Sequence, residues 1–337
     1  MRRFCALWLF WLASCLSASA WGWGSEGHRD VGAVADALLK GTPAAAQVRR
    51  ILGSGGTLQT AAIWADCAKS IHPEQDFEYV KDMYYDSHCA AFDATPAGVA
   101  EMADYVRRNN DNCVYAGGRR NCHKAFHFAD IPIQENRYDA GFVGAEPYDV
   151  VHAIAAAVAR LQHKPVPAPF RFADGMQGER EALRLIAHFV GDLHQPLHVG
   201  SVYLSPGGLA LNPDQTGHDP DTDTVGGNVL SVGHSQLHAE WDDAPTLTPA
   251  ALLAAARAVP ASRGAMGTWP AAWAGEAIVQ ARSAFAPIRF GAKSGRNWPA
   301  TFSDRAAYIK LRDQIQAKQL ARAGKRLAEL LKAVWPR

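Results

Sequence analysis

An eleven-residue segment, His188–His198 (HFVGDLHQPLH), constrains this chain more than any other. His188 and Asp192 are four residues apart, so on a helix they share one face. An imidazole and a carboxylate at that spacing can hold one zinc ion. At about 100° per residue, His194 is rotated by about 200° from Asp192 and points elsewhere. The segment therefore predicts a helix that carries metal ligands on one face.

Pro196 modifies this expectation for the end of the segment. A proline inside a helix removes one backbone hydrogen bond and crowds the preceding turn, which predicts a kink. The kink would swing His198 back toward the site. An alternative interpretation of the segment is a helix with buried, hydrogen-bonded histidines and no metal. Three histidines and an aspartate within eleven residues favour a metal site instead.

Further groups of the same residue types lie elsewhere in the chain. Together with the segment His188–His198 they supply about nine nitrogen and oxygen ligands, enough for more than one zinc ion. They are the pair His238 and Asp242, the segment His127–Asp130, the segment Trp64–Asp66, and the segment Trp23–His28.

The N-terminus has the pattern of a secretory signal peptide. Met1–Arg3 is basic, residues 4–16 are apolar, and residues 17–20 are small. A membrane anchor is the alternative, but the apolar run is short for a membrane span, and no later segment is long and apolar enough. Cleavage after Ala20 or after Gly22 satisfies the small-residue rule. We expect cleavage after Gly22, a signal peptide over residues 1–22, a mature domain over residues 23–337, and a secreted or periplasmic protein.

Export fits the cysteines that remain after cleavage, because their number is even and disulfides form in oxidising compartments. Three pairings are possible, and the short loops favour Cys67–Cys89 and Cys113–Cys122. A zinc knuckle is a weaker alternative, because no C-x-x-C spacing occurs.

The mature chain is predicted to be one mainly α-helical domain. Hydrophobic residues make up 48% of the chain and charged residues 20%, which excludes wholesale disorder. Strand signals are sparse, with 228–232 the best, and 202–225 is expected to be a long loop. Asp219–Asp223 resembles a calcium loop, but Thr224 and Leu230 replace the glycine and glutamate that such a loop needs. Helical spacing of apolar residues predicts helices over 31–52, 97–108, 149–162, 177–195, 250–259, 269–285 and 303–334, with Ser303 as the N-cap of the last.

The ordered motifs W-G-x-x-G-H, W-A-D, H-F-x-D-x-P, H-F-x-G-D-x-H-Q-P-L-H, G-G-N and L-H-x-x-W-D run from Trp23 to Asp242. This set resembles the zinc-dependent single-strand-specific nuclease family of the S-one/P-one type. The resemblance implies a compact multi-helix domain of the phospholipase C/nuclease type, stabilised by disulfides, with a cleft that holds three Zn²⁺ ions.

The resemblance also implies a ligand set for each zinc ion, with His194 outside all of them. One ion would be held by Asp66, His127, His188 and Asp192. A second would be held by the amine and carbonyl of Trp23, by His28, and by Asp192 as a bridge. A third would be held by His198, His238 and Asp242.

The implied activity is hydrolysis of phosphoester bonds in single-stranded RNA and DNA and in 3′-mononucleotides, with 5′-phosphate products. A zinc-bound hydroxide would be the nucleophile. Asp66 would orient it, and Lys69 would offset charge on the phosphorus. Phe128 would stack on a base, which tolerates different bases, and Asp130, Gly226 and Asn228 match other substrate-binding positions. No protein partner is implied.

Two other functions are compatible with parts of the pattern. A zinc-dependent phospholipase C shares the helical fold and the three-zinc site, but the G-G-N and H-F-x-D-x-P motifs favour a nuclease. Zinc storage would require neither Phe128 nor Lys69.

The charge balance excludes a basic arm as the means of binding a polyanion. The chain has 34 basic and 33 acidic side chains; the signal peptide removes Arg2 and Arg3, which leaves 32 basic side chains and a formal charge of −1. Three zinc ions would raise this to about +5 and concentrate the positive charge in one cleft.

Overall fold

A computed structural model describes residues 23–81, 88–111, 113 and 121–337 of the chain. The expected signal peptide, residues 1–22, lies outside the described residues. The described chain is mainly helical, as expected. Its longer helices are α1 (Ser25–Leu39), α2 (Pro43–Leu52), α6 (Pro96–Arg108), α8 (Val150–Leu161), α9 (Gly175–Asp192), α12 (Pro249–Ala258), α13 (Trp269–Phe285) and α14 (Arg305–Val334).

Short helices and turns connect these elements. They are α3 (Leu58–Ala61), α4 (Trp64–Ala68), α5 (Ala90–Asp93), α7 (Cys122–Ala125), α10 (Pro213–Thr216), α11 (Leu237–Asp242), and the 3₁₀ turns η1 (Pro73–Gln75), η2 (Pro196–His198), η3 (Pro220–Thr222) and η4 (Met266–Thr268). The segment 202–225, expected to be a loop, contains α10, η3 and the hairpin described below.

The strands are short, at two to five residues each. One four-stranded sheet has the order β8 (Ser235–Gln236), β7 (Leu230–Val232), β10 (Trp298–Phe302), β9 (Ile288–Phe290). Two-stranded pairs are β1 (Ile71–His72) with β2 (Glu78–Tyr79), β3 (Ile131–Pro132) with β4 (Gly200–Ser201), and β5 (Tyr203–Leu204) with β6 (Ala210–Leu211). The expected strand over 228–232 is confirmed as β7, whereas β9 and β10 were not predicted.

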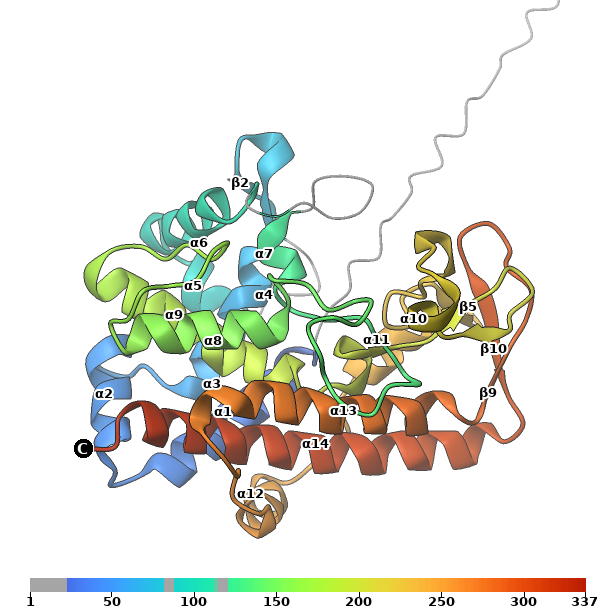
Figure 1. Cartoon of the computed structure of the whole chain (residues 1–337). Helices are drawn as coiled ribbons and strands as arrows, with labels where there is room; N and C mark the ends of the chain where they lie inside the picture. The colour runs from blue at the N-terminus through green and yellow to red at the C-terminus, as the bar shows by residue number, and fades with distance from the viewer. Residues whose placement is uncertain (1–22, 82–87, 112, 114–120) are drawn as a thin grey trace, which may run out of the picture.

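Helix α14 is the longest element and organises the core. It lies beside α13 along one side of the molecule, with β9 and β10 at one end of the pair (Figure 1). It also packs closely on α1, because a Cβ on Gly324 would lie 2.6 Å from Cβ of Val34. Its N-cap is Asp304, which accepts a hydrogen bond from the backbone N of Ala307 at 2.9 Å. The expectation that Ser303 caps this helix was wrong by one residue.

Two other helix boundaries differ from the expectation. The predicted helix over 31–52 is two helices, because Gly41 adopts a φ of 78° and Thr42 caps a new helix that starts with Pro43. The predicted helix over 177–195 ends at Asp192 rather than kinking. Gln195 has an extended backbone, as expected for a residue before proline, so Pro196 begins a separate turn.

Both expected disulfides are present. Cys67 pairs with Cys89, and Cys113 pairs with Cys122. The first joins α4 to the start of α5, and the second joins residue 113 to the start of α7. Each bond closes a short loop of the chain near the residues of the site described below.

Candidate metal centre

Buried histidines and aspartates gather in three groups, in each of which the potential ligand atoms lie within 4.8 Å of one another. They come from helices α1, α4, α9 and α11, from the turn η2, and from the segment between α7 and β3. The groups are His28, His188 and Asp192; Asp66, His127 and His188; and His198, His238 and Asp242.

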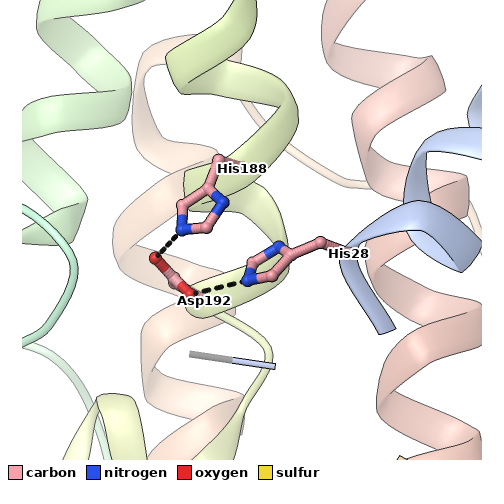
Figure 2. A group of neighbouring side chains, drawn as sticks. All are labelled: His28, His188 and Asp192. Atoms are coloured by element: carbon pink, nitrogen blue, oxygen red, sulfur yellow. Dashed lines mark ion pairs between the residues drawn. The ribbon is translucent and has the colours of Figure 1, made fainter. Parts of the chain in front are cut away.

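Asp192, the last residue of α9, is the centre of this arrangement. Its Oδ1 lies 3.3 Å from Nε2 of His28 and 3.8 Å from Nδ1 of His198. Its Oδ2 lies 2.9 Å from Nδ1 of His127 and 3.1 Å from Nε2 of His188. One carboxylate therefore contacts four histidines from different parts of the chain. Figure 2 shows two of them, His28 and His188, directed at Asp192 from different helices.

The contact between α1 and α9 sets the position of His28. Its ring stacks on that of His188, with centroids 3.8 Å apart and planes at 17°. A Cβ on Gly191 would lie 2.8 Å from Nδ1 of His28, so only glycine fits there without moving the ring. The indole Nε1 of Trp23 donates to the carbonyl of Gly191 at 2.9 Å. The first described residue is thus held against the ligand-bearing helix.

Backbone carbonyls fix the tautomers of several ring ligands. A histidine that donates from one nitrogen presents the other, unprotonated, to its surroundings, which is the usual arrangement of a metal-binding imidazole. The bonds run from His188 Nδ1 to Ala62 O (2.6 Å), from His198 Nδ1 to His127 O (2.9 Å), and from His238 Nδ1 to Gly226 O (2.7 Å).

The pKa values of His28 and His127 favour neutral imidazoles, and that of Asp192 favours an ionised carboxylate. Burial lowers the pKa of His28 to about 4 and that of His127 to about 3. Burial alone would raise the pKa of Asp192, but the neighbouring histidines hold it well below its usual value. His28, His127 and Asp192 are therefore in the protonation states that metal binding requires. Burial would lower the pKa of His188, but Asp192 and Asp66 raise it above its usual value.

Asp242 differs from the other carboxylates of the centre. Burial raises its pKa well above the usual value, and the nearby carboxylates Asp66 and Asp192 raise it further. Its Oδ1 accepts a hydrogen bond from Nε2 of Gln195 at 2.8 Å and lies 3.6 Å from Nε2 of His238. A cation at this group would offset the crowding of negative charge.

Asp66 lies beside the one lysine that the sequence analysis singled out. Lys69 Nζ is 2.7 Å from Asp66 Oδ1, and both side chains are buried. Burial would raise the pKa of Asp66, but the Lys69 ammonium and the nearby histidines lower it below its usual value. The pair places a positive charge next to the negative charge of Asp66, which is one ligand in the group of Asp66, His127 and His188.

The donor set fits metal ions. In the described part of the chain, Asp192 Oδ1 and both ring nitrogens of His28 are buried and make no hydrogen bond. Buried polar atoms normally have a hydrogen-bond partner. A cation bound between His28 Nε2 and Asp192 Oδ1 would give both atoms a partner. Imidazole and carboxylate ligands suit zinc.

A recess contains Phe128 and Asp130, which follow His127 in the chain. It is lined by Ala125, Phe128, Asp130, Gly144, Glu146, Tyr148 and Asp149. Gly226 and Asn228, expected to bind substrate as well, do not line this recess. Gly226 instead accepts the bond from His238, and the Asn228 side chain donates to Val225 O at 2.8 Å.

His194 points away from the three groups, as its position on the helix predicted. Its Nδ1 bonds to Val190 O at 2.7 Å, and its Nε2 accepts from Nη1 of Arg326 on α14 at 3.0 Å. The sequence analysis did not identify Arg326 or the role of Gln195. Gln195 lies inside the H-Q-P-L-H motif, so that motif was the available signal, whereas nothing in the sequence near Arg326 indicated its partner.

In the acidic segment Asp219–Asp223, two carboxylates accept hydrogen bonds from nearby backbone nitrogens. Asp219 Oδ1 accepts from the backbone N of Asp221 at 3.0 Å, and Asp223 Oδ1 accepts from that of Val225 at 2.7 Å. These carboxylates stabilise turns.

No helix in the described ranges is long and apolar enough to cross a membrane.

Comparisons with known proteins agree with the family resemblance that the motifs indicated. The family model of the S1/P1 nucleases matches residues 23–335. Endonuclease 1 of Arabidopsis thaliana is 28% identical over 177 residues, a match that covers 46% of this chain and 49% of that endonuclease. The chain thus spans about half the length of the curated relative that it matches. Since the family model covers nearly the whole chain after residue 22, the protein belongs to the S1/P1 nuclease family.

Proposed function

We propose that this protein is a metal-dependent endonuclease and 3′-nucleotidase that hydrolyses phosphoester bonds of single-stranded RNA and DNA and leaves 5′-phosphates. The observation that carries the proposal is the contact of Asp192 with four histidines, together with the separate group of His198, His238 and Asp242. Membership of the S1/P1 nuclease family supports the same activity.

The ligands of the metal centre would hold three Zn²⁺ ions, numbered here as in the sequence analysis. The first ion would be held by Asp66, His127, His188 and Asp192. The third ion would be held by His198, His238 and Asp242. The second would be held by His28, Asp192 and the amine and carbonyl of Trp23. The buried position of Trp23 against Gly191, and the bond from Gly24 N to Asp242 O at 2.8 Å, support this role for the mature N-terminus.

The side chains around the ions have separate tasks. When bound, zinc ions supply Lewis acidity that activates water and polarises a phosphate near neutral pH. Asp66 accepts a hydrogen bond from the attacking water and orients it. Lys69 holds its charge 2.7 Å from Asp66, where it can donate to a phosphate oxygen that gains negative charge.

The recess lined by Phe128 and Asp130 would account for a preference for single strands. Phe128 offers a ring on which an unstacked base can lie, and stacking of this kind is tolerant of base identity. Asp130 would accept hydrogen bonds from the base, and Gly226 and Asn228 would contact the nucleotide from the side of His238. A base inside a duplex is stacked on its neighbours and cannot enter.

We also propose that the protein is exported, after cleavage following Gly22. The two disulfides support this, because such bonds persist mainly in oxidising compartments. Export and cleavage would expose the amine of Trp23, which the second zinc site requires.

A substrate panel tests the activity. Single-stranded RNA, single-stranded DNA, 3′-AMP and phosphatidylcholine are compared with and without a chelator, using protein whose first residue is Trp23. We expect turnover of the first three, loss of turnover with chelator, and recovery with Zn²⁺. Rapid turnover of phosphatidylcholine with none of nucleic acid would overturn the proposal in favour of a phospholipase C.

A matched pair of variants tests the recess. Phe128→Leu should raise KM for single-stranded substrates and leave the metal content at the wild-type value, because it removes only the stacking ring. Phe302→Leu is the control, since Phe302 lies on β10 and packs against Tyr308. Equal KM values for the two variants would contradict the role of Phe128.

A further inference from the structure

Helix α14 holds the two chain segments that carry the third group of ligands, His198, His238 and Asp242. The hydrogen bonds from α14 go to backbone carbonyls of these segments, not to the ligand side chains. Helix α11 ends at Asp242, and the carbonyls at a helix end have no partner within the helix. The Nε2 atom of Gln316 on α14 donates to the carbonyls of Trp241 at 2.9 Å and Asp243 at 3.1 Å. The two peptide carbonyls flanking the ligand Asp242 are therefore held by one amide.

The orientation of this amide is determined by its partners. A glutamine Nε2 carries two hydrogens, and both are used here. A flipped amide would point its oxygen at two carbonyl oxygens, which repel it. The side chain of Gln316 is fully buried, and its Oε1 makes no hydrogen bond within the described residues. An unpaired buried acceptor is unfavourable, so Gln316 is better explained by what its nitrogen holds than by core packing.

Gln319, three residues later on the same helix, holds the other ligand-bearing segment. Its Nε2 donates to the carbonyl of His194 at 2.9 Å, and its Oε1 accepts from Nη1 of Arg322 at 2.9 Å. His194 lies between Asp192 and His198 in the chain. Gln319 thus fixes the backbone of the turn that carries His198.

The turn held by Gln319 also reaches the ligand Asp242. Gln195, the residue after His194, donates from Nε2 to Asp242 Oδ1 at 2.8 Å and accepts from the backbone N of Leu197 at 2.6 Å. Asp242 is therefore fixed through its carboxylate by Gln195 and through its backbone by Gln316. Gln316 lies on α14, and Gln195 directly follows His194, whose carbonyl is bonded to Gln319 of α14.

We propose that Gln316 and Gln319 are positioning residues for the metal ion held by His198, His238 and Asp242. The three ligands come from two segments that are far apart in the chain. The bond from Gln195 to Asp242 joins these segments directly, and the two glutamines of α14 hold each segment through its backbone. A metal site tolerates little change in the distances between its ligands, and loss of a group that orients metal ligands typically lowers metal affinity by about 10- to 100-fold. The proposal rests on the proposed function, in that this group binds a metal ion.

The test uses Gln316→Met and Gln319→Met in the full mature chain loaded with Zn²⁺. Methionine preserves the length and volume of glutamine but donates no hydrogen bond. Zinc content per chain is measured by elemental analysis, and zinc release is followed with a coloured chelator at 25 °C. We expect one of the three ions to leave about 10- to 100-fold faster than in the wild type, with the other two unchanged.

A control separates positioning from loss of stability. Leu320→Ala removes a fully buried side chain from the same helix and leaves both glutamines in place. It should lower the melting temperature at least as much as the glutamine variants, while all three ions leave at the wild-type rates. If either glutamine variant that folds also releases all three ions at wild-type rates, the inference is overturned.

The proposed function fails in a different way. If Asp242→Ala keeps the zinc content of the wild type, no bound ion depends on Asp242. That result would rule out the third metal site itself. Wild-type protein with three ions and glutamine variants with unchanged release would leave the proposed function intact and reject only the positioning role.

Discussion

The Nζ atom of Lys69 lies 2.7 Å from Oδ1 of Asp66, and both side chains are buried in the described structure. Removal of one member of a buried ion pair leaves an uncompensated charge, at a cost of about 3–5 kcal/mol. A metal ion on Asp66 would compensate that charge. The state of the metal centre should therefore decide how much stability Lys69 contributes.

Lys69→Met should lower the free energy of unfolding by about 3–5 kcal/mol in metal-free protein and by clearly less in zinc-loaded protein. Denaturant unfolding with chelator and with Zn²⁺ measures both values. Activity of the loaded variant should fall by about 10²- to 10³-fold, because a charge that stabilises the transition state is lost. The exposed Lys310→Met is the control and should change neither quantity. Equal stability losses in the two forms would exclude a metal ion on Asp66.

Gly191→Ala should displace His28, because the new Cβ would lie 2.8 Å from its Nδ1. The variant should bind one zinc ion fewer than the wild type, by elemental analysis. Alanine is the better helix former by roughly 1 kcal/mol, so a loss of metal cannot come from weaker helix propensity. Gly267→Ala is the control, since its Cβ would meet no atom within 4 Å. Full zinc content in Gly191→Ala would contradict this placement of His28.

Asp192→Asn should remove the two ions that share this carboxylate and leave the one held by His198, His238 and Asp242. Activity should fall below detection. Asp243→Asn, at an exposed carboxylate next to Asp242, should keep the wild-type zinc content. The assignment of Asp192 as a bridge would be falsified if Asp192→Asn retained three ions.

A free amine on Trp23 should be necessary for the second ion. Protein that begins at Trp23 is compared with protein that begins at Gly22 and with protein acetylated on Trp23. The extended and acetylated forms should each lose one ion and most activity, because neither offers the Trp23 amine as a ligand. An extended form with three ions and full activity would rule out this role and the requirement for cleavage after Gly22.

Outside the metal centre, His152 should make stability depend on pH. Its Nδ1 lies 3.0 Å from Asp149 Oδ1, and this hydrogen bond raises the pKa of His152. Because the folded state favours the protonated form, the stabilisation is fully present below about pH 6.5 and is lost as pH rises through the raised pKa. The melting temperature of His152→Gln should therefore fall below that of wild type in acid and approach it at high pH. A difference that grows with pH would contradict the sign.

The longer helices could be predicted from the sequence because their apolar residues repeat at helical spacing, and α6, α8, α12 and α13 begin and end within two residues of the expected positions. The prediction was less accurate where a local backbone conformation interrupts that spacing. Gly41 separates α1 from α2, and the extended conformation of Gln195 ends α9 before Pro196. Such breaks depend on single backbone angles, which an apolar pattern does not encode.

The amino-acid sequence alone predicted the kinds of ligand, the shared helix face of His188 and Asp192, and the outward direction of His194, because these follow from residue identity and helix geometry. It also identified both disulfides through their short loops. Family resemblance, rather than spacing, assigned ligands to separate ions.

Packing between distant segments, by contrast, brings Asp192 into contact with His28 and His127 as well as His188, and it lets Gln195 and α14 hold Asp242. His28 and Asp192 are far apart in the chain, and their 3.3 Å contact depends on how closely α1 packs on α9 at Gly191. Distances of that kind result from packing of whole helices. Spacing within one helix cannot define them, since it places residues only relative to their own helix axis.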